Sequence, residues 1–304
     1  MTRRTIGGMS GQASPDGDLA AATAAFVSVR PRLFGIAYRV LGSANDAEDI
    51  LQEAWLRWQN YDHSTVEDPA AFLATTTTRL AINFAQTARA RHEAYVGPWL
   101  PEPVDTSADP GLGAERGEAL GFAVLLLLEQ LTPTERAAYV LREAFDYPYP
   151  QIAEIIQSSE ASARQLVSRA RRHIAGERPA VTTTAREQRR LLDAFLAAAQ
   201  SGDVAELEKL LAADVVSYSD GGGRVRASIH PVRTRTTVAK FIHAFASHFW
   251  VGVTLEPVQA NGQPASVLRR DGVPVAVVAL VHGDNGIDQV LWMMNPDKLT
   301  KIAV

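Results

Sequence analysis

Apolar and polar residues recur at helical spacing from about residue 19 to residue 95. Gly42-Ser43 stops the first apolar stripe, and Ser43 or Asn45 can cap the helix that follows. Asp68-Pro69 opens a third long helix, because proline in a first turn loses no hydrogen bond. The first two apolar stripes consist of Leu33, Ile36, Ala37, Val40 and Leu41, and of Ile50, Leu51, Ala54, Trp55 and Trp58. This pattern predicts an all-α domain over residues 18–95, after a disordered leader at residues 1–17.

Helices resume after a segment with the composition of a linker. Residues 96–113 hold four prolines and three glycines, which favour turns and extended chain. Thr132-Pro133-Thr134-Glu135 is a capping box that begins a new helix. A short helix near residues 149–157, the pair Ser158-Ser159 and a helix that ends near His173 then predict a helix-turn-helix. We therefore expect a second all-α domain over residues 114–176 and a short linker over residues 177–185.

The pattern changes after Arg186 from helices alone to helices and strands. Two helices are expected at residues 186–200 and 203–212, and a third at 236–248. Strand-like runs occupy residues 215–219, 251–258, 266–269, 273–281 and 289–293. Helices followed by a meander of strands predict an α+β domain with a curved antiparallel sheet over residues 186–304.

Composition and charge narrow the class of protein. The chain of 304 residues has no cysteine, which excludes disulfides and thiolate metal sites and favours the cytoplasm. A net charge of −4 argues against non-specific coating of nucleic acid. No apolar run approaches the roughly 20 residues that a membrane span needs. Residues 157–176 carry four arginines against one glutamate, whereas residues 46–53 carry four acids and no base, which indicates two different partners.

The second helix of the helix-turn-helix has the residue types of a DNA-reading surface. One face is apolar, with Leu166, Val167, Ala170 and Ile174. The other face holds the side chains suited to phosphates and base edges, which are Arg164, Gln165, Ser168, Arg171 and Arg172. The alternative is a solvated, arginine-rich helix end near its negative dipole pole. Residues 75–92, rich in Thr, Asn, Gln and Arg, are a weaker candidate for holding unstacked bases.

The residues give no convincing catalytic or metal set. Asp220-Gly221-Gly222-Gly223-Arg224 lacks the GK[ST] of a phosphate-binding loop and fits a glycine hairpin between strands. The histidines lack metal-pair spacing, since His243 and His248 are five residues apart. We expect no catalytic residue, no metal and no cofactor.

Two long segments resemble a known family. YRVLGSANDAEDILQEAWLRW (38–58) resembles region 2, and LTPTERAAYVLREAFDYPYPQIAEIIQSSEASARQLVSRARRHI (131–174) resembles region 4, of extracytoplasmic-function (ECF) sigma factors of the sigma-70 family. YVGPWLPEP, SDGGGRVRA and NPDKL are similar to motifs of the group that bears a C-terminal SnoaL-like cone, a curved sheet with helices.

The resemblance implies that the chain is not an enzyme but binds core RNA polymerase and promoter DNA. It implies docking on the β′ clamp coiled coil through Asp46, Glu48, Asp49, Gln52 and Glu53. It implies minus-10 melting by Asp62, His63, Ser64, Arg79, Asn83, Gln86, Arg89 and Arg91. It implies minus-35 recognition by Ser162, Arg164, Gln165, Ser168, Arg171 and Arg172, while the rest of region 4 meets the β flap. Asn83 replaces a frequent Asp, and fewer cations on this helix predict a shallower salt dependence.

The resemblance also implies control in cis by the C-terminal domain, with no obligatory anti-sigma partner. We expect an interdomain contact among Trp99, Pro101, Glu102, Pro103, Asp220, Gly221, Gly222, Gly223, Arg224, Asn295, Pro296, Asp297, Lys298 and Leu299. Trp99 between prolines is suited to an interface, although it could simply cover apolar surface. A small molecule in the cone is possible. Two alternatives remain open, a one-component ligand-responsive DNA-binding regulator and a SnoaL-like enzyme fused to a DNA-binding module.

Overall fold

The computed structural model describes residues 15–93, 95–106, 121–175, 184–300 and 302. The first helical part comprises α1 (Pro15–Leu41), α2 (Ala44–Gln59), the 3-10 turn η1 (His63–Thr65) and α3 (Pro69–Glu93). Ser43 caps α2 by accepting the Asp46 amide at 3.1 Å, so of the two expected caps it is Ser43 that acts. Helix α1 begins inside the segment expected as a leader, of which residues 1–14 lie outside the described residues.

By length and composition alone, Leu19–Leu41 of α1 passes the test for a membrane-spanning helix. Burial of the last nine residues accounts for part of this apolar character. Every residue from Leu33 to Leu41 is buried in the helical core.

The second helical part comprises α5 (Phe122–Glu129), α6 (Pro133–Glu143), α7 (Tyr149–Ile155) and α8 (Glu160–Ala175). The capping box before α6 is confirmed, with the Thr132 side chain bonded to the Glu135 amide and the Glu135 carboxylate bonded to the Thr132 amide. The helix-turn-helix is also confirmed as α7, a turn and α8. Ala163, Val167 and Ala170 bury the inner face of α8, and Leu166 is partly buried.

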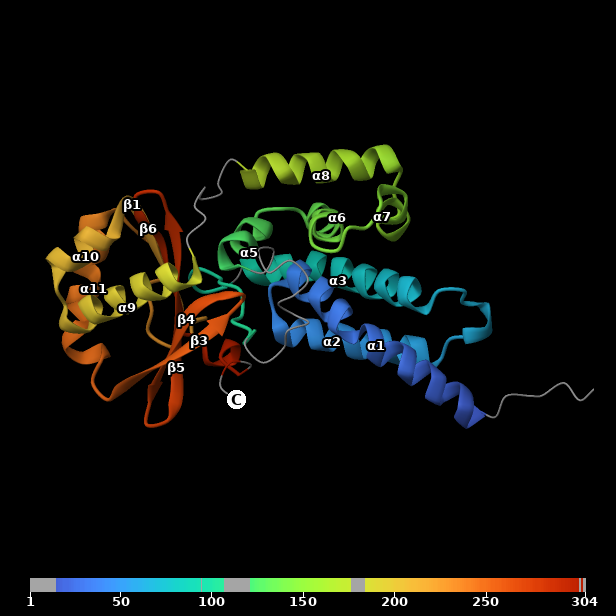
Figure 1. Cartoon of the computed structure of the whole chain (residues 1–304), viewed down its shortest axis with the longest axis horizontal. Helices are drawn as coiled ribbons and strands as arrows, with labels where there is room; N and C mark the ends of the chain where they lie inside the picture. Colours follow the sequence, from blue (N-terminus) through green and yellow to red (C-terminus); the bar gives the residue numbers. More distant parts are fainter. Residues whose placement is uncertain (1–14, 94, 107–120, 176–183, 301, 303–304) are drawn as a thin grey trace, which may run out of the picture.

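The two helical parts share one continuous core. Buried residues of α1, α2 and α3 pack in the same apolar cluster as those of α5, α6 and α8. Polar contacts cross the same boundary. The Arg136 guanidinium of α6 donates to the Val40 carbonyl of α1 at 2.8 Å, and Arg79 of α3 donates to the Ile155 and Glu154 carbonyls at the end of α7. Figure 1 shows α8 lying above α6 on the side away from α1 and α2.

The C-terminal part is the expected α+β domain. Its helices are α9 (Ala185–Ser201), α10 (Val204–Leu210) and α11 (Arg235–Phe249). Its strands are β1 (Leu211–Asp220), β2 (Val232–Arg233), β3 (Val253–Ala260), β4 (Gln263–Arg270), β5 (Val273–Gly283) and β6 (Gly286–Met293), and the turn η3 (Pro296–Lys298) follows. The strand order is β2-β1-β6-β5-β4-β3.

Two details differ from the sequence expectation. The pairing of β1 with β6 is parallel, so the sheet is mixed and not wholly antiparallel. Strand periodicity reports which face a residue occupies and says nothing of strand direction. The helix expected to reach residue 212 ends at Leu210, because Leu211 already begins β1.

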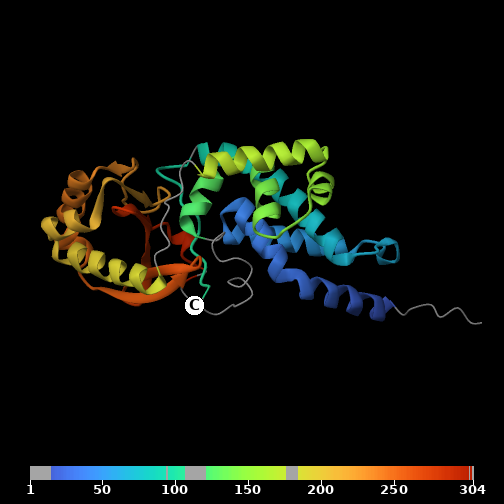
Figure 2. The same ribbon diagram turned by 45° about the horizontal axis from the view of Figure 1, so that its top comes forward.

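Both faces of the sheet are covered, by different parts of the chain. One face packs on α9, α10 and α11 around Phe195, Leu207 and Ile242. The other face packs on Leu100 and on Phe122 of α5, together with Leu299 and Ile302 from the end of the chain. Figure 2 shows the sheet between α9 on its outer side and the helical parts of the chain.

Residues 95–106, which we call the strap, run between the helical parts and the second face of the sheet (Figure 1). Residues 96–106 belong to the segment 96–113 that was expected to be a linker, and within it Leu100, Pro101, Glu102 and Pro103 are buried. The backbone of the strap bonds on both sides. The Glu102 amide donates to the Gly42 carbonyl at 2.9 Å, and the Thr106 amide donates to Gln259 of β3 at 3.0 Å. The strap therefore packs as structure between two domains.

Gly42 is a point of close packing between the strap and the first helical part. It has a φ of +67°, and an added Cβ would collide with the Trp99 ring. Gly272, with a φ of +79°, has no atom of the described residues within 4 Å of such a Cβ. We expect Gly42→Ala to lower the free energy of unfolding by roughly 1–3 kcal/mol more than Gly272→Ala, because only the former adds overpacking to backbone strain. Urea unfolding of both variants measures the difference, and equal losses would contradict the packing of Trp99 on Gly42.

Candidate functional site

A buried ion pair anchors the strap to the C-terminal domain. The Lys298 ammonium lies 2.7 Å from the Asp220 carboxylate, and both side chains are almost fully buried. The strap supplies further hydrogen-bond partners to both charged groups. Asp220 accepts the Leu100 amide at 2.8 Å and the Tyr95 hydroxyl at 2.6 Å, and Lys298 donates to the Leu100 carbonyl at 2.6 Å. We call Asp220, Lys298, Tyr95 and Asn295 the anchor cluster.

Aromatic rings of the strap complete the anchor cluster. The Lys298 ammonium lies 4.0 Å from the centroid of the Trp99 ring and 5.0 Å from that of Tyr95. A cation over an aromatic face gains most when both are shielded from water. Asn295 donates to the Tyr95 hydroxyl at 2.9 Å and caps η3 by accepting the Asp297 amide. Trp99 thus packs between Lys298 on one side and Gly42 on the other.

The glycine loop after β1 allows Asn295 and Tyr95 to lie close to its backbone. Gly222 has a φ of +57°, and an added Cβ would collide with the Asn295 amide and lie 2.7 Å from the Tyr95 hydroxyl. Gly221 is buried, while Gly223 and Arg224 are exposed. Arg224 pairs with Asp297 at 3.2 Å on the open surface. Pro296 is exposed, and Leu299 is buried against the second face of the sheet.

Glu102 anchors the strap to the first helical part. Its carboxylate accepts the Ser43 hydroxyl at 2.8 Å and the amides of Ala44 and Asn45 at 2.8 and 3.1 Å. These are the unpaired donors at the start of α2, where the helix dipole also favours a negative charge. Asn45 in turn donates to the Asp297 carbonyl at 3.3 Å. A strap residue therefore caps the acidic helix.

A second set of polar contacts joins the first helical part, the strap and the C-terminal sheet. The Tyr38 hydroxyl of α1 donates to the Glu102 carbonyl at 2.6 Å and accepts from the Asn261 side chain, which lies between β3 and β4. Asn261 also makes two hydrogen bonds with Val104 of the strap. Its side-chain oxygen accepts the Val104 amide at 2.8 Å, and its backbone amide donates to the Val104 carbonyl at 2.9 Å. The first helical part, the strap and the sheet are thus held by one chain of hydrogen bonds.

Burial shifts the ionisation of these groups. Burial raises the pKa of Glu102 above its usual range, against hydrogen bonds from Ser43 and the α2 amides that favour the carboxylate. Burial lowers the pKa of Lys298, while the adjacent Asp220 opposes this shift. Burial raises the pKa values of Tyr38 and Tyr95, and the hydrogen bond to Asp220 adds to the effect at Tyr95. Both tyrosines, neutral at pH 7 in any case, therefore also stay neutral at higher pH than an exposed tyrosine does.

The acidic helix α2 presents its polar side chains outward. Asp49, Gln52 and Glu53 are exposed, while Asp46 and Glu48 are half-buried. Glu48 pairs with Arg30 at 2.5 Å, and Glu53 pairs with Arg57 one turn later at 2.8 Å. The opposite face of the helix, with Ile50, Leu51, Ala54 and Trp58, is buried.

The residues expected to contact the minus-10 element lie at the turn η1 and on helix α3. Asp62 caps η1 by accepting the Ser64 amide and hydroxyl, and the His63 ring bonds the Trp58 carbonyl at 2.8 Å. Asn83 and Gln86 are exposed on α3. Arg79 is engaged with the end of α7, as described above. The side chains of Arg89 and Arg91 lie outside the described part of the chain.

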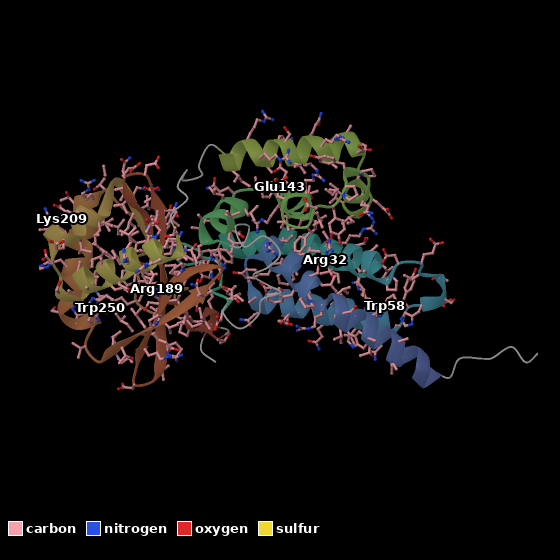
Figure 3. The ribbon with its side chains drawn as sticks, viewed as in Figure 1. Arg32, Trp58, Glu143, Arg189, Lys209 and Trp250 are labelled. Atoms are coloured by element: carbon pink, nitrogen blue, oxygen red, sulfur yellow. The ribbon has the colours of Figure 1, made fainter. Side chains whose placement is uncertain are left out.

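The outer face of α8 carries the side chains expected at the minus-35 element. Arg164, Gln165, Ser168, Arg171 and Arg172 are exposed, and Ser162 is half-buried. Arg164 pairs with Glu160 and lies 4.3 Å from the centroid of the Tyr149 ring of α7. Arg171 pairs with Glu143 at 2.7 Å, and this pairing raises the pKa of Arg171. Figure 3 shows Glu143 on the inner side of α8.

Comparison with known proteins identifies the class. A model of sigma-70 region 2 matches residues 25–91, and a model of sigma-70 region 4 matches residues 121–174. The chain is 34% identical to the ECF RNA polymerase sigma factor SigJ of Mycobacterium tuberculosis, over 90% of this chain and 92% of that protein. It is 32% identical to the probable ECF RNA polymerase sigma factor SigI of the same species, over 91% of this chain and 94% of that protein.

A solved structure agrees with the sequence matches. The crystal structure of the M. tuberculosis ECF sigma factor SigJ superposes with a TM-score of 0.73 at 32% identity, over 92% of this chain and 98% of that one. The chain therefore belongs to the ECF RNA polymerase sigma factors of the sigma-70 family. Its region 2 and region 4 domains support promoter-specific transcription initiation.

Several residues of the site escaped the sequence patterns. Asn261 belongs to none of the motifs quoted from the sequence, and Tyr38 and Tyr95 stood only as the first residues of the motif at 38–58 and of YVGPWLPEP. The contacts of Arg79 with α7 and of Arg136 with α1 were also not foreseen. The usable signal in the sequence is the turn dipeptide Asn261-Gly262, and Asn261 indeed has a φ of 54°, which asparagine tolerates better than most residues.

The anchor cluster makes a test of stability possible. We expect Lys298→Met to lower the free energy of unfolding by roughly 3–5 kcal/mol, because it leaves the buried Asp220 carboxylate without its cation. Adding Asp220→Asn removes that charge, so the double variant should lose less than the sum of the two single variants. Arg224→Met, at the exposed pair with Asp297, is the matched control and should cost under about 1 kcal/mol. Urea unfolding measures all four, and additive losses would argue against a coupled pair.

Proposed function

We propose that this sigma factor is held in a compact resting arrangement by its own C-terminal domain, through the strap. The observation that carries the proposal is the strap itself, whose Glu102 caps α2 while its Leu100 backbone is bonded to Asp220 and Lys298. The continuous core between the two helical parts supports the same arrangement. Control in cis is consistent with the resemblance of the C-terminal domain to the SnoaL-like cone, and no obligatory anti-sigma partner is then required.

The compact arrangement cannot span a promoter. Minus-10 and minus-35 elements are centred about 25 base pairs apart, or roughly 85 Å at 3.4 Å per base pair. Regions 2 and 4 share a core here, and Arg79, expected to contact the minus-10 element, is bonded to the end of α7. We infer that promoter binding separates the two regions and frees Arg79 for DNA.

Region 2 meets polymerase through the outer face of α2. The exposed Asp49, Gln52 and Glu53, with Asp46 and Glu48 beside them, form an acidic surface suited to the basic β′ clamp coiled coil. Asp62, His63 and Ser64, together with Asn83, Gln86, Arg89 and Arg91 of α3, act on the minus-10 element.

Region 4 reads the minus-35 element through the outer face of α8, and its remaining surface meets the β flap. Arginine and glutamine side chains on one exposed helix face are the residue types that read base edges. Polymerase supplies the chemistry, so the chain acts as a non-catalytic initiation factor, in the cytoplasm with polymerase and DNA. The acidic face of α2 disfavours the one-component regulator, which has no need of it.

Run-off transcription with core polymerase tests the docking surface. We expect Asp49→Ala/Glu53→Ala to reduce specific initiation at least tenfold, because two exposed charges of the acidic surface are lost. Glu206→Ala/Glu208→Ala on α10 is the matched control and should leave initiation unchanged. Equal activity of the two double variants would refute docking through α2. Tight promoter binding by the chain alone, without initiation, would favour the one-component regulator.

Energy transfer between two dyes tests the compact resting state. The chain has no cysteine, so Glu67→Cys and Gln151→Cys give two unique labelling sites, in the loop before α3 and on α7. We expect high transfer in the free protein and low transfer in the complex with polymerase and promoter. Trp99→Ala should lower transfer in the free protein, because it removes the ring between Lys298 and Gly42. High transfer in the promoter complex, or no effect of Trp99→Ala, would contradict the proposal.

A further inference from the structure

The first face of the sheet contains an aromatic cavity that neither the strap nor the DNA-binding surfaces use. Its volume is about 180 Å³, and it opens between the C-terminal half of α11, the ends of β1 and β6, and the loop after β1. The apolar lining comes mainly from rings, which are Phe241, Phe245, Phe249, Trp250 and Trp292, with Met294 beside them. Figure 3 shows Trp250 in the C-terminal domain, far from the helical parts.

The rings of the cavity are arranged by contact with one another. Phe249 meets Trp250 and Trp292 edge-on, at interplanar angles of 87° and 90°, and Phe241 meets Phe245 at 61°. Trp292 is buried, but Phe241, Phe245, Phe249 and Trp250 are only half-buried. Aromatic rings prefer edge-to-face and offset contacts, so this lining suits a planar aromatic molecule better than a flexible aliphatic chain.

The volume limits the size of the occupant. An engineered apolar cavity of about 150 Å³ in another protein binds benzene. A cavity of about 180 Å³ with an open mouth therefore accommodates a molecule of one or two fused rings.

The cavity lining includes a charged side chain, Arg226, that the described part of the fold does not use. Arg226 is exposed and makes no hydrogen bond or ion pair with the residues that the structure describes. The neighbouring Arg224 pairs with Asp297 instead. Ser219 is a buried polar residue of the lining, and on the same face of β1 the Ser217 hydroxyl is buried without a partner among the described residues. Among the residues that the structure describes, the lining includes no carboxylate, and Arg226 is its one charged member.

We propose that this cavity binds a small planar aromatic acid, whose rings lie among the aromatic side chains of α11 and β6 and whose anionic group meets Arg226. A guanidinium binds a carboxylate in a planar, two-point geometry. The proposal goes beyond transcription initiation, and its test uses binding alone, so it does not depend on the cis-control proposed above.

Isothermal titration of the full-length chain tests the site with three probes. These are 2-naphthoate, its neutral analogue 2-naphthalenemethanol, and octanoate as a straight-chain acid. We expect 2-naphthoate to bind with a negative heat-capacity change, which marks apolar burial, and at least fivefold more tightly than either other probe. Arg226→Gln should weaken 2-naphthoate about fivefold to tenfold and leave 2-naphthalenemethanol within twofold. Arg224→Gln, two residues away and outside the lining, is the matched control and should change neither.

Two further variants locate the site. Ala227→Phe adds a ring to the lining and should abolish binding of 2-naphthoate. Should that variant fail to fold, Phe245→Ala, at a half-buried ring, should weaken binding at least tenfold. Absence of 2-naphthoate binding below 1 mM, or binding indifferent to both variants, would overturn the site. Tighter binding of octanoate, or equal binding of the two naphthalene probes with no effect of Arg226→Gln, would overturn the assigned ligand class.

Discussion

The contact between the helical parts and the C-terminal domain depends on one buried ion pair, Lys298 with Asp220. A buried pair stabilises a structure only where its geometry is good and its remaining donors and acceptors are satisfied. Both conditions are met by the strap, because the Leu100 backbone offers an amide to Asp220 and a carbonyl to Lys298. Without the strap the two charges would be undersatisfied, and without the charges the strap would lose its central anchor. The pair therefore specifies where the strap lies.

The strap converts this local anchor into an interdomain arrangement. Its Trp99 and Glu102 face the first helical part, while Leu100 enters the apolar cluster on the second face of the sheet. Because the side chains of these few residues contact both domains, a short segment is enough to join them. Phe122 at the start of α5 enters the same cluster as Leu100, which brings the second helical part to the same face of the sheet.

The sequence predicts the local structure correctly but does not predict which residues distant in the chain come into contact. Caps such as Ser43 and Thr132 predicted helix starts correctly, because a capping signal lies within four residues of its effect. The prolines of the strap indicated a linker, yet Leu100 is buried by residues more than a hundred positions later in the chain. The resemblance to a family grouped the strap with Asp220 and Lys298, whereas their pairing came only from the structure. Likewise, no sequence pattern predicts that β1 and β6 run parallel.

Strands β1 and β6 contact the strap on one face of the sheet and line the aromatic cavity on the other. Asp220 of the anchor cluster follows Ser219 of the cavity, Asn295 follows Met294, and the Met294 amide donates to the Asp220 carbonyl at 2.8 Å. A molecule in the cavity is therefore one peptide unit from the groups that hold the strap. Such a molecule can change the hold on regions 2 and 4 only as far as it binds the anchored and released arrangements with different affinity. By linkage, release of the strap must then change the affinity of the cavity by the same factor.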